Sequence, residues 1–253
     1  MEKYRNVMYL PVIKKLKGGQ IMPIFIFLFS KIGILSRWAK EAGTSAWLVK
    51  TEEKYGGLVT GAYVNKLSPN DTREFEVLRR KGMRGGDRMN PLYHNYAPIY
   101  SKYLKQFLDK KVALLEVGIL RGTGLAIWSD LFGGGRVIGA DIDLFNYEEN
   151  IKNLRELGAF SNKNIEVHLF DQFENNIKLL ENILKGDKLD IVIDDGAHTD
   201  ESILKTLDSI CPHLNKNFVY FIEDNSTVWK KVAKKFPKWK VINYHEMTVC
   251  THH

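Results

Sequence analysis

Five short apolar runs mark the hydropathy pattern of the chain after residue 111. They span residues 112–118, 136–143, 164–170, 189–195 and 217–224, and they are rich in β-branched side chains. The longer stretches between them mix charged and apolar residues, as is typical of amphipathic helices. Near-continuous apolar strands that alternate with helices predict a parallel sheet covered on both faces. We therefore expect a doubly wound, mostly parallel α/β domain.

The segments that follow the first two predicted strands carry glycines and acids. In a doubly wound sheet, ligands bind beyond the carboxyl ends of the strands. The first run leads into "EVGILRGTG", which contains Glu116, Gly118, Gly122 and Gly124. Glycines at such a turn let the backbone approach a ligand and direct helix N-terminal amides toward an anion. Asp141 lies 23 residues after Gly118, a spacing at which an acid accepts hydrogen bonds from ribose hydroxyls. Together they predict a cofactor that contains a nucleoside.

The same glycine spacing occurs in nicotinamide-dependent short-chain dehydrogenases. Those enzymes use a downstream Tyr-x-x-x-Lys pair, in which the lysine lowers the pKa of the tyrosine. No tyrosine after Gly124 has a lysine four residues further on. We therefore do not expect hydride transfer.

The net charge of the chain is concentrated at its N-terminus. Of the formal charge of +7, all is accounted for by residues 1–40, which hold one acid, Glu2, and eight bases: Lys3, Arg5, Lys14, Lys15, Lys17, Lys31, Arg37 and Lys40. The rest of the chain is neutral, which argues against a nucleic-acid partner. Two cysteines in 253 residues exclude a disulfide scaffold and indicate a reducing, cytoplasmic location.

Residues 21–29, "IMPIFIFLF", form an apolar run inside this basic segment. Nine residues are far fewer than the roughly 20 that a membrane span needs. Pro23 and the lack of a small-residue cleavage site argue against a signal peptide. Two interpretations remain. The run is a helix that packs on the domain or on a second subunit of a homo-oligomer, or residues 1–40 lie on anionic lipid at the inner face of the membrane. Packing is favoured, since short apolar runs are usually core.

Five motifs in order give the sequence a family resemblance. They are "LLEVGILRGTG", "GADID", "FDQ", "IDDGAH" and "FIEDN", and they resemble class I S-adenosylmethionine-dependent methyltransferases. More closely, they resemble the metal-dependent sugar O-methyltransferases of the macrocin and mycinamicin type. Residues 85–104 are similar to the segment before the core of that group. The resemblance implies a Rossmann-like methyltransferase sheet at residues 111–253, a connecting segment at 81–110 near the active site, and a mainly helical extension at 1–80.

The resemblance implies roles for the residues that end the first three strands. Glu116, Gly118 and Gly122 would line the methionine and ribose of S-adenosylmethionine, and Asp141 would hold the ribose hydroxyls. Asp171 and Gln172 would lie near the adenine. Asp171 has an alternative role as the N-cap of the following helix, because an aspartate there accepts hydrogen bonds from free amides. The role of Asp194 stays open between a cofactor contact and support from behind the site.

In the resembling enzymes the metal ligands correspond to Asp195, Glu223 and Asp224. Neighbouring parallel strands lie about 4.8 Å apart, so carboxylates at two strand ends are crowded. Like charges raise each other's pKa unless a cation lies between them, and hard oxygen donors suit Mg²⁺ or another divalent cation. His198, three residues after Asp195, corresponds to the general base, since an imidazole can take the proton of a metal-activated hydroxyl.

The acceptor implied by the resemblance is a sugar hydroxyl of a small-molecule glycoside or a glycan. Methylation of a catechol-like small diol is an alternative within enzymes. A noncatalytic subunit that kept the cofactor fold is an alternative from another class, but it would have no need for the acids and His198. His94, in an aromatic segment, either closes over the site or packs structurally.

Overall fold

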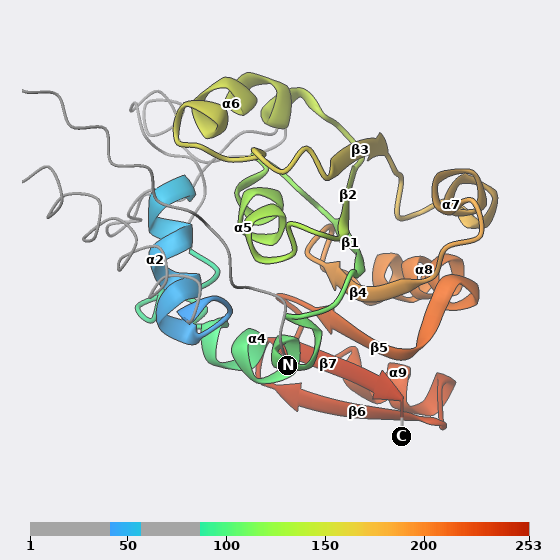
Figure 1. The fold of residues 1–253 in the computed structure, drawn as a ribbon. Coiled ribbons are helices and arrows are strands. Elements are labelled where there is room, and N and C mark those ends of the chain that lie inside the picture. Colours follow the sequence, from blue (N-terminus) through green and yellow to red (C-terminus); the bar gives the residue numbers. More distant parts are fainter. Residues whose placement is uncertain (1–40, 57–86, 253) are drawn as a thin grey trace, which may run out of the picture. The chain divides into compact units, whose positions relative to one another are not determined.

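The computed structural model of the protein describes residues 41–56 and 87–252. The predictions made for residues 1–40 lie outside the described residues. At the centre is a seven-stranded sheet with the strand order β3-β2-β1-β4-β5-β7-β6 (Figure 1). Its strands are β1 (Ala113–Val117), β2 (Arg136–Asp141), β3 (Ile165–Leu169), β4 (Leu189–Asp194), β5 (Leu214–Ile222), β6 (Trp239–Tyr244) and β7 (Met247–His252).

The first five strands correspond to the five apolar runs, and their pairings β2–β3, β1–β2, β1–β4 and β4–β5 are all parallel. The predicted doubly wound architecture is therefore confirmed. Strands β6 and β7 were not predicted. They form a hairpin that joins the sheet antiparallel to β5, with Tyr220 opposite Cys250 and Tyr244 opposite Met247.

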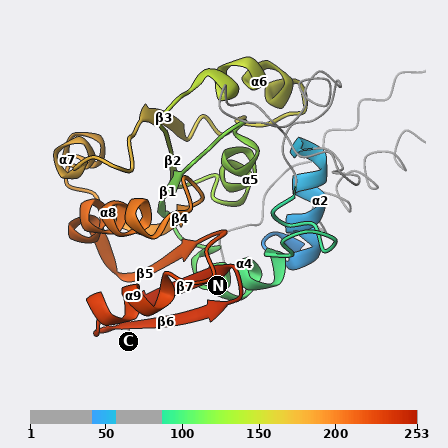
Figure 2. The same cartoon turned by 180° about the vertical axis from the view of Figure 1, so that it is seen from behind.

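Helices cover both faces of the sheet (Figures 1 and 2). One face packs against α2 (Ser45–Gly56), α4 (Ala97–Leu104), α5 (Thr123–Leu131) and α6 (Phe145–Glu156). The other packs against α7 (Ile177–Leu184), α8 (Asp200–Ile210) and α9 (Trp229–Lys235). Two short 3-10 turns, η1 (Lys105–Phe107) and η2 (Cys211–His213), follow α4 and α8.

Alternation along the buried strands divides the core into two layers. In β1, Leu114 belongs to the layer under α5, while Leu115 belongs to the layer under α8. Every residue of β1 is buried, as expected for a central parallel strand with helices on both sides. Trp128 of α5 is fully buried and its ring packs against Tyr100 of α4. This packing fixes α4, and the residues just before it, against the sheet.

The order of the strands reverses between β1 and β4: β2 and β3 lie on one side of β1, and β4 and β5 lie on the other. The loops that follow β1 and β4 begin next to each other at this point. Asp195 donates a backbone hydrogen bond to Val117, at 2.8 Å, just beyond the last pair of these strands. Gly118 follows with φ of +84°, and a methyl group on it would overlap the carbonyl oxygen of Asp195. The two loops therefore leave the sheet in close contact, at the position where ligands bind in such folds.

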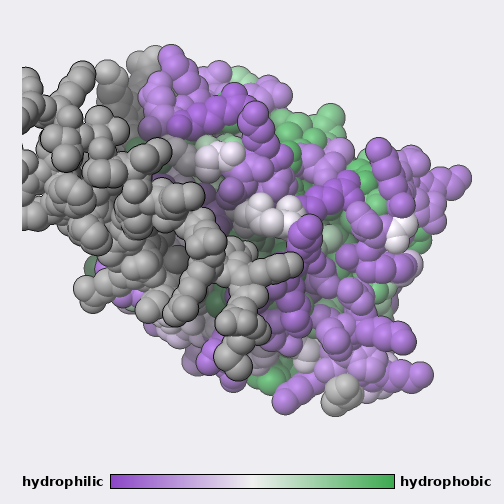
Figure 3. All heavy atoms as spheres, viewed as in Figure 1, coloured by the Kyte–Doolittle hydropathy of each residue, from purple (hydrophilic) through white to green (hydrophobic). Residues whose placement is uncertain are grey.

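The exposed surface is mostly hydrophilic on the face shown in Figure 3, with a hydrophobic area over β3, beside α6. Three large apolar side chains are exposed around the ends of β2 and β3 and the start of α6: Ile142, Phe145 and Leu169. Within residues 41–56 and 87–252, no helix has the length and apolar character needed to cross a membrane.

Candidate cofactor and metal site

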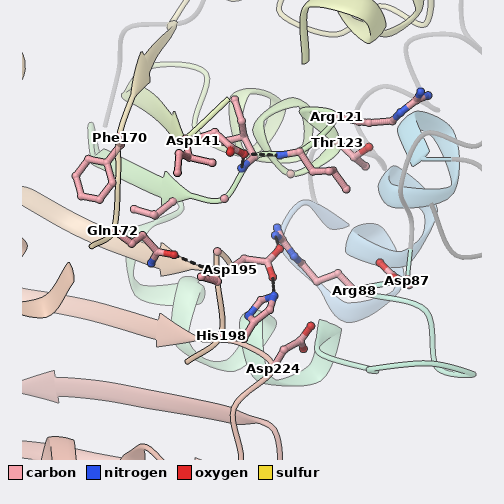
Figure 4. Close-up of a pocket in the computed structure, with 18 of the residues that line it drawn as sticks. Asp87, Arg88, Arg121, Thr123, Asp141, Phe170, Gln172, Asp195, His198 and Asp224 are labelled. Atoms are coloured by element: carbon pink, nitrogen blue, oxygen red, sulfur yellow. Dashed lines mark hydrogen bonds and ion pairs between the residues drawn. The ribbon is translucent and has the colours of Figure 1, made fainter. Parts of the chain in front are cut away.

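A cavity of about 550 Å³ lies at the carboxyl edge of the sheet (Figure 4). Seven predicted site residues line it: Gly118, Asp141, Asp171, Gln172, Asp195, His198 and Asp224. Four others do not: Glu116, Gly122, Asp194 and Glu223. The cavity extends from Asp141 on one side to Asp224 on the other (Figure 4). The structure therefore brings together residues of five loops that are far apart in the sequence.

The turn after β1 is built around Asp141. Its Oδ2 accepts hydrogen bonds from the amides of Ile119 at 2.8 Å and Leu120 at 3.0 Å. Its Oδ1 accepts a longer bond of 3.3 Å from the Asp143 amide. Gly122, with φ of +76°, is the N-cap residue of α5. Asp141 thus shapes the glycine turn with one oxygen and has capacity for a ligand on the other.

Asp171 does not cap the helix that follows it, so that part of the prediction was wrong. Helix α7 begins only at Ile177, and Asn176 occupies its N-cap position. Asp171 Oδ1 instead accepts the amide of Phe173 at 2.8 Å, and its carbonyl accepts from the Asn176 side chain at 2.7 Å. These local bonds favour a turn over a helix in the residues between them, because such side chains compete with helical bonding.

Asp194 supports Gln172 from behind the cavity. Gln172 donates through Nε2 to Asp194 Oδ1 at 2.7 Å, and its Oε1 accepts the amide of Ala197 at 2.7 Å. Asp194 is almost wholly buried, and burial raises the pKa of its carboxyl to about 7. Asp194 itself does not line the cavity, whereas Gln172, which donates to it, does.

Arg88 lies among three carboxylates that come from three strand ends. Its Nη1 is 2.6 Å from Glu116 Oε1, its Nε is 3.0 Å from Glu223 Oε2, and its Nη2 contacts Asp195. Glu116 and Glu223 are only 1% and 2% exposed. Burial raises the pKa of both carboxyls, and the Arg88 guanidinium opposes that rise. We expected a metal ion as the cation beside Asp195, Glu223 and Asp224, and Arg88 was not predicted because "GGDRMN" offers no local signal for it.

Of the three predicted metal ligands, Asp195 and Asp224 lie in one cluster with His198, and Glu223 lies outside it; Asp195 also contacts Arg88. Ligand atoms of Asp195, His198 and Asp224 all lie within 4.8 Å of one another, with His198 Nε2 at 3.9 Å from Asp195 Oδ1. Glu223, by contrast, is held by Arg88 and accepts the Tyr100 hydroxyl. Both residues follow the end of β5 at Ile222, and Asp224 has a left-handed backbone with φ of +54°. Asp224 lines the cavity, whereas Glu223 is buried.

Asp224 is held from the segment that precedes α4. Its Oδ1 accepts the Tyr96 hydroxyl at 2.6 Å and lies 3.3 Å from His94 Nδ1. The same nitrogen of His94 is 3.3 Å from Glu246 Oε2, at the turn between β6 and β7. His94 therefore lines the cavity, as the first of its two interpretations held, and is not a packed core residue. Residues 88–100 supply contacts to the acids at the ends of β1, β4 and β5.

Comparison with curated proteins finds relatives of one kind, although no model of a protein family matches the chain. It is 27% identical over 143 residues to the demethylmacrocin O-methyltransferase of Streptomyces fradiae, covering 54% of this chain and 33% of the relative. It is 26% identical over 171 residues to the 8-demethyl-8-alpha-L-rhamnosyl tetracenomycin-C 2'-O-methyltransferase of Streptomyces olivaceus, covering 64% of this chain and 41% of that protein. The chain spans about a third of the length of the first of these curated relatives and about two fifths of the second.

Among solved structures, the fold is similar to the MycE methyltransferase from the mycinamycin biosynthetic pathway, in complex with Mg, SAH and mycinamycin VI. The TM-score is 0.52 at 19% identity, over 65% of this chain and 51% of that chain. The predicted methyltransferase fold is therefore confirmed. The resemblance to macrocin- and mycinamicin-type O-methyltransferases is confirmed as well.

Proposed function

We propose that the chain is an S-adenosylmethionine-dependent, Mg²⁺-assisted O-methyltransferase that acts on a sugar hydroxyl. The observation that carries this proposal is one cavity with a glycine turn and Asp141 on one side and the cluster of Asp195, His198 and Asp224 on the other. A methyl donor bound along the glycine turn would thus face a group able to take a proton. Both curated relatives are O-methyltransferases by name, and the name of one includes a rhamnosyl group, which supports the same reaction.

The residues around the glycine turn fit S-adenosylmethionine. Asp141 Oδ1 has capacity for the ribose hydroxyls, and Gly118 places backbone atoms, with no side chain, against the cavity. Gln172 and Asp171 line the side where the adenine would lie. Glu116 is buried against Arg88 and does not line the cavity, so we assign it to holding Arg88.

The donor set of the second cluster fits a divalent cation. Asp195 and Asp224 offer carboxylate oxygens, which Mg²⁺ prefers, and His198 lies beside them. Glu223, the third ligand implied by the resemblance, would have to leave Arg88 to join them. When bound, Mg²⁺ would lower the pKa of an acceptor hydroxyl and so ease its deprotonation.

His198 is the proposed general base. Its Nδ1 is buried without a hydrogen-bond partner among the described residues, while Nε2 lies on the side of Asp195. Nε2 is therefore the nitrogen that can accept the proton of the acceptor hydroxyl as that oxygen attacks the methyl group. Asp195 would stabilise the imidazolium that results.

The finer assignments rest on the sequence. We propose a cytoplasmic homo-oligomer with the extension at residues 1–80, the connecting segment at 81–110 and the methyltransferase domain at 111–253. In the described part of the extension, α2 packs against α4 and α5. A catechol-like small diol is the alternative acceptor.

A screen of glycosides tests this function. The full chain with S-adenosylmethionine and Mg²⁺ should form homocysteine, in a coupled assay, only when a suitable glycoside is present. His198→Ala should bind S-adenosylhomocysteine like the wild type but lose turnover by about 10²–10⁴-fold. If catechols alone are methylated, the acceptor class is wrong. If S-adenosylhomocysteine does not bind the wild type, the methyltransferase proposal itself fails.

A further inference from the structure

Asn225 lies where three loops of the site meet. It follows Asp224 directly and is 9% exposed. Its Nδ2 donates to the carbonyl oxygen of His198 at 2.9 Å and to Asp200 Oδ1 at 3.0 Å. Its backbone amide donates to the Glu246 carbonyl at 2.9 Å, at the turn between β6 and β7. One residue therefore joins the loop after β4, the loop after β5 and the hairpin turn.

The other end of the side chain fixes its orientation. Asn225 Oδ1 accepts the backbone amides of Val228 at 2.7 Å and Thr227 at 2.8 Å. Since these two partners only donate, the oxygen must face them, and Nδ2 must face His198 and Asp200. All four hydrogen-bonding positions of the side-chain amide are used. No other residue type of this size offers two donors and two acceptors in this geometry.

The two residues that Asn225 connects have unusual backbone conformations. His198 has φ of +56° and Asp224 has φ of +54°. Residues other than glycine adopt this left-handed region rarely and at a cost, so surrounding contacts must hold them there. The ladder between β4 and β5 ends with the bond from the Glu223 amide to the Asp194 carbonyl. Beyond it, in the described residues, the direct hydrogen bonds between residues 195–200 and 224–228 come from Asn225 and from the Thr227 hydroxyl.

We propose that Asn225 is a positioning residue that sets the orientation of His198 and Asp195 relative to Asp224, and so the affinity of the site for Mg²⁺. This inference rests on the proposed function, because it assumes that Asp195 and Asp224 hold the metal beside His198. The Asp141 side of the cavity does not depend on Asn225, whose side-chain bonds all lie on the Asp224 side. Loss of Asn225 should therefore weaken metal binding and leave cofactor binding intact.

The test is a pair of titrations on the full chain, one with MgCl₂ in the presence of S-adenosylhomocysteine and one with S-adenosylhomocysteine alone. Asn225→Ala should weaken Mg²⁺ binding by about 10–100-fold, the usual effect of losing a group that supports a ligand. In Asn225→Asp one carboxylate oxygen can still accept the amides of residues 227 and 228. The other replaces Nδ2 and cannot donate to His198 or Asp200, so this variant should weaken Mg²⁺ binding similarly. Thr227→Val is the matched control: it removes a hydroxyl from the same network without touching His198.

The results separate the possible outcomes. Selective loss of Mg²⁺ affinity in both Asn225 variants, with Thr227→Val like the wild type, supports the proposal. Unchanged Mg²⁺ affinity in Asn225→Asp overturns it, even if Asn225→Ala does not fold. Equal weakening of Mg²⁺ and S-adenosylhomocysteine overturns it too, since that result indicates general loosening. If the wild type binds S-adenosylhomocysteine but no Mg²⁺, the metal site of the proposed function fails, and this inference fails with it.

Discussion

Replacing Arg88 by methionine should lower the free energy of unfolding by more than the loss of a surface ion pair would. Methionine has a similar length but no charge, so the buried carboxylates Glu116 and Glu223 lose their shared cation. Removing one partner from a buried ion pair costs about 3–5 kcal/mol, because the remaining charge is left without compensation. At roughly 2–4 °C per kcal/mol for a domain of this size, the midpoint of thermal unfolding should fall by about 6–20 °C.

The loss in the Arg88 variant should depend on pH. Burial already raises the pKa of Glu116 and Glu223, and removing Arg88 takes away the group that opposes this. A carboxyl whose pKa is higher in the folded state binds a proton there that the unfolded chain has released, so stability falls as pH rises. Arg88→Met should therefore be closest to the wild type near pH 5 and furthest from it near pH 8.

Urea unfolding in EDTA, without ligands, measures this difference. Arg136→Met is the control, because Arg136 pairs with Glu166 and Asp187 in a more exposed place, where a salt bridge contributes about 0–1 kcal/mol. Arg88→Lys keeps the charge and should lie between the wild type and Arg88→Met. A loss below about 1 kcal/mol at pH 8, or a loss that does not shrink at pH 5, would refute the reasoning.

Two further predictions concern a buried acid and a glycine. Glu52 is a buried residue of α2 that accepts the Met89 amide at 2.8 Å, and burial raises its pKa to about 7, so its ionisation should lower the free energy of unfolding as pH rises toward 7. Urea unfolding of Glu52→Gln at several pH values should lack that part of the pH dependence, and an unchanged dependence would contradict the assignment. Gly118→Ala and Gly158→Ala both place a side chain at positive φ, but only the first meets backbone atoms. Gly158→Ala should lower the free energy of unfolding by about 1–2 kcal/mol, while Gly118→Ala should lower it by more and abolish S-adenosylhomocysteine binding. Equal losses of stability by calorimetry would contradict the close approach of the backbone at Gly118.

The parallel half of the sheet could be predicted because each buried strand is a continuous apolar run with a turn after it. The hairpin of β6 and β7 could not. Its edge strand is only half buried and mixes Lys240 and Asn243 with apolar residues, and its turn, His245 and Glu246, lacks the Asn-Gly pair typical of such hairpins. His245 adopts φ of +57° without being a glycine. Glu246 of this turn contacts His94 at the site, and local sequence rules often fail at such places.

Part of the candidate site could be predicted from the ends of the strands, and part depends on long-range contacts. The order of motifs placed Asp141, Asp195 and His198 at one edge, because parallel strands bring their carboxyl ends together. The pairing of Glu223 with Arg88 depends on a contact between residues 135 positions apart, which no local pattern encodes. We predicted the same role, metal ligand, for Glu223 and Asp224, which are neighbours in the sequence. In the structure Glu223 pairs with Arg88, whereas Asp224 contacts Tyr96 and His94.

The metal dependence of methyl transfer tests the central claim most directly. The full chain should be incubated with S-adenosylmethionine carrying a labelled methyl group and a panel of glycosides, in MgCl₂ or in EDTA. The account predicts label in a glycoside with MgCl₂, none in EDTA, and recovery when Mg²⁺ is added in excess. Full transfer in EDTA would contradict the metal role of Asp195 and Asp224, and no transfer to any glycoside, diol or other hydroxyl would contradict the proposed reaction.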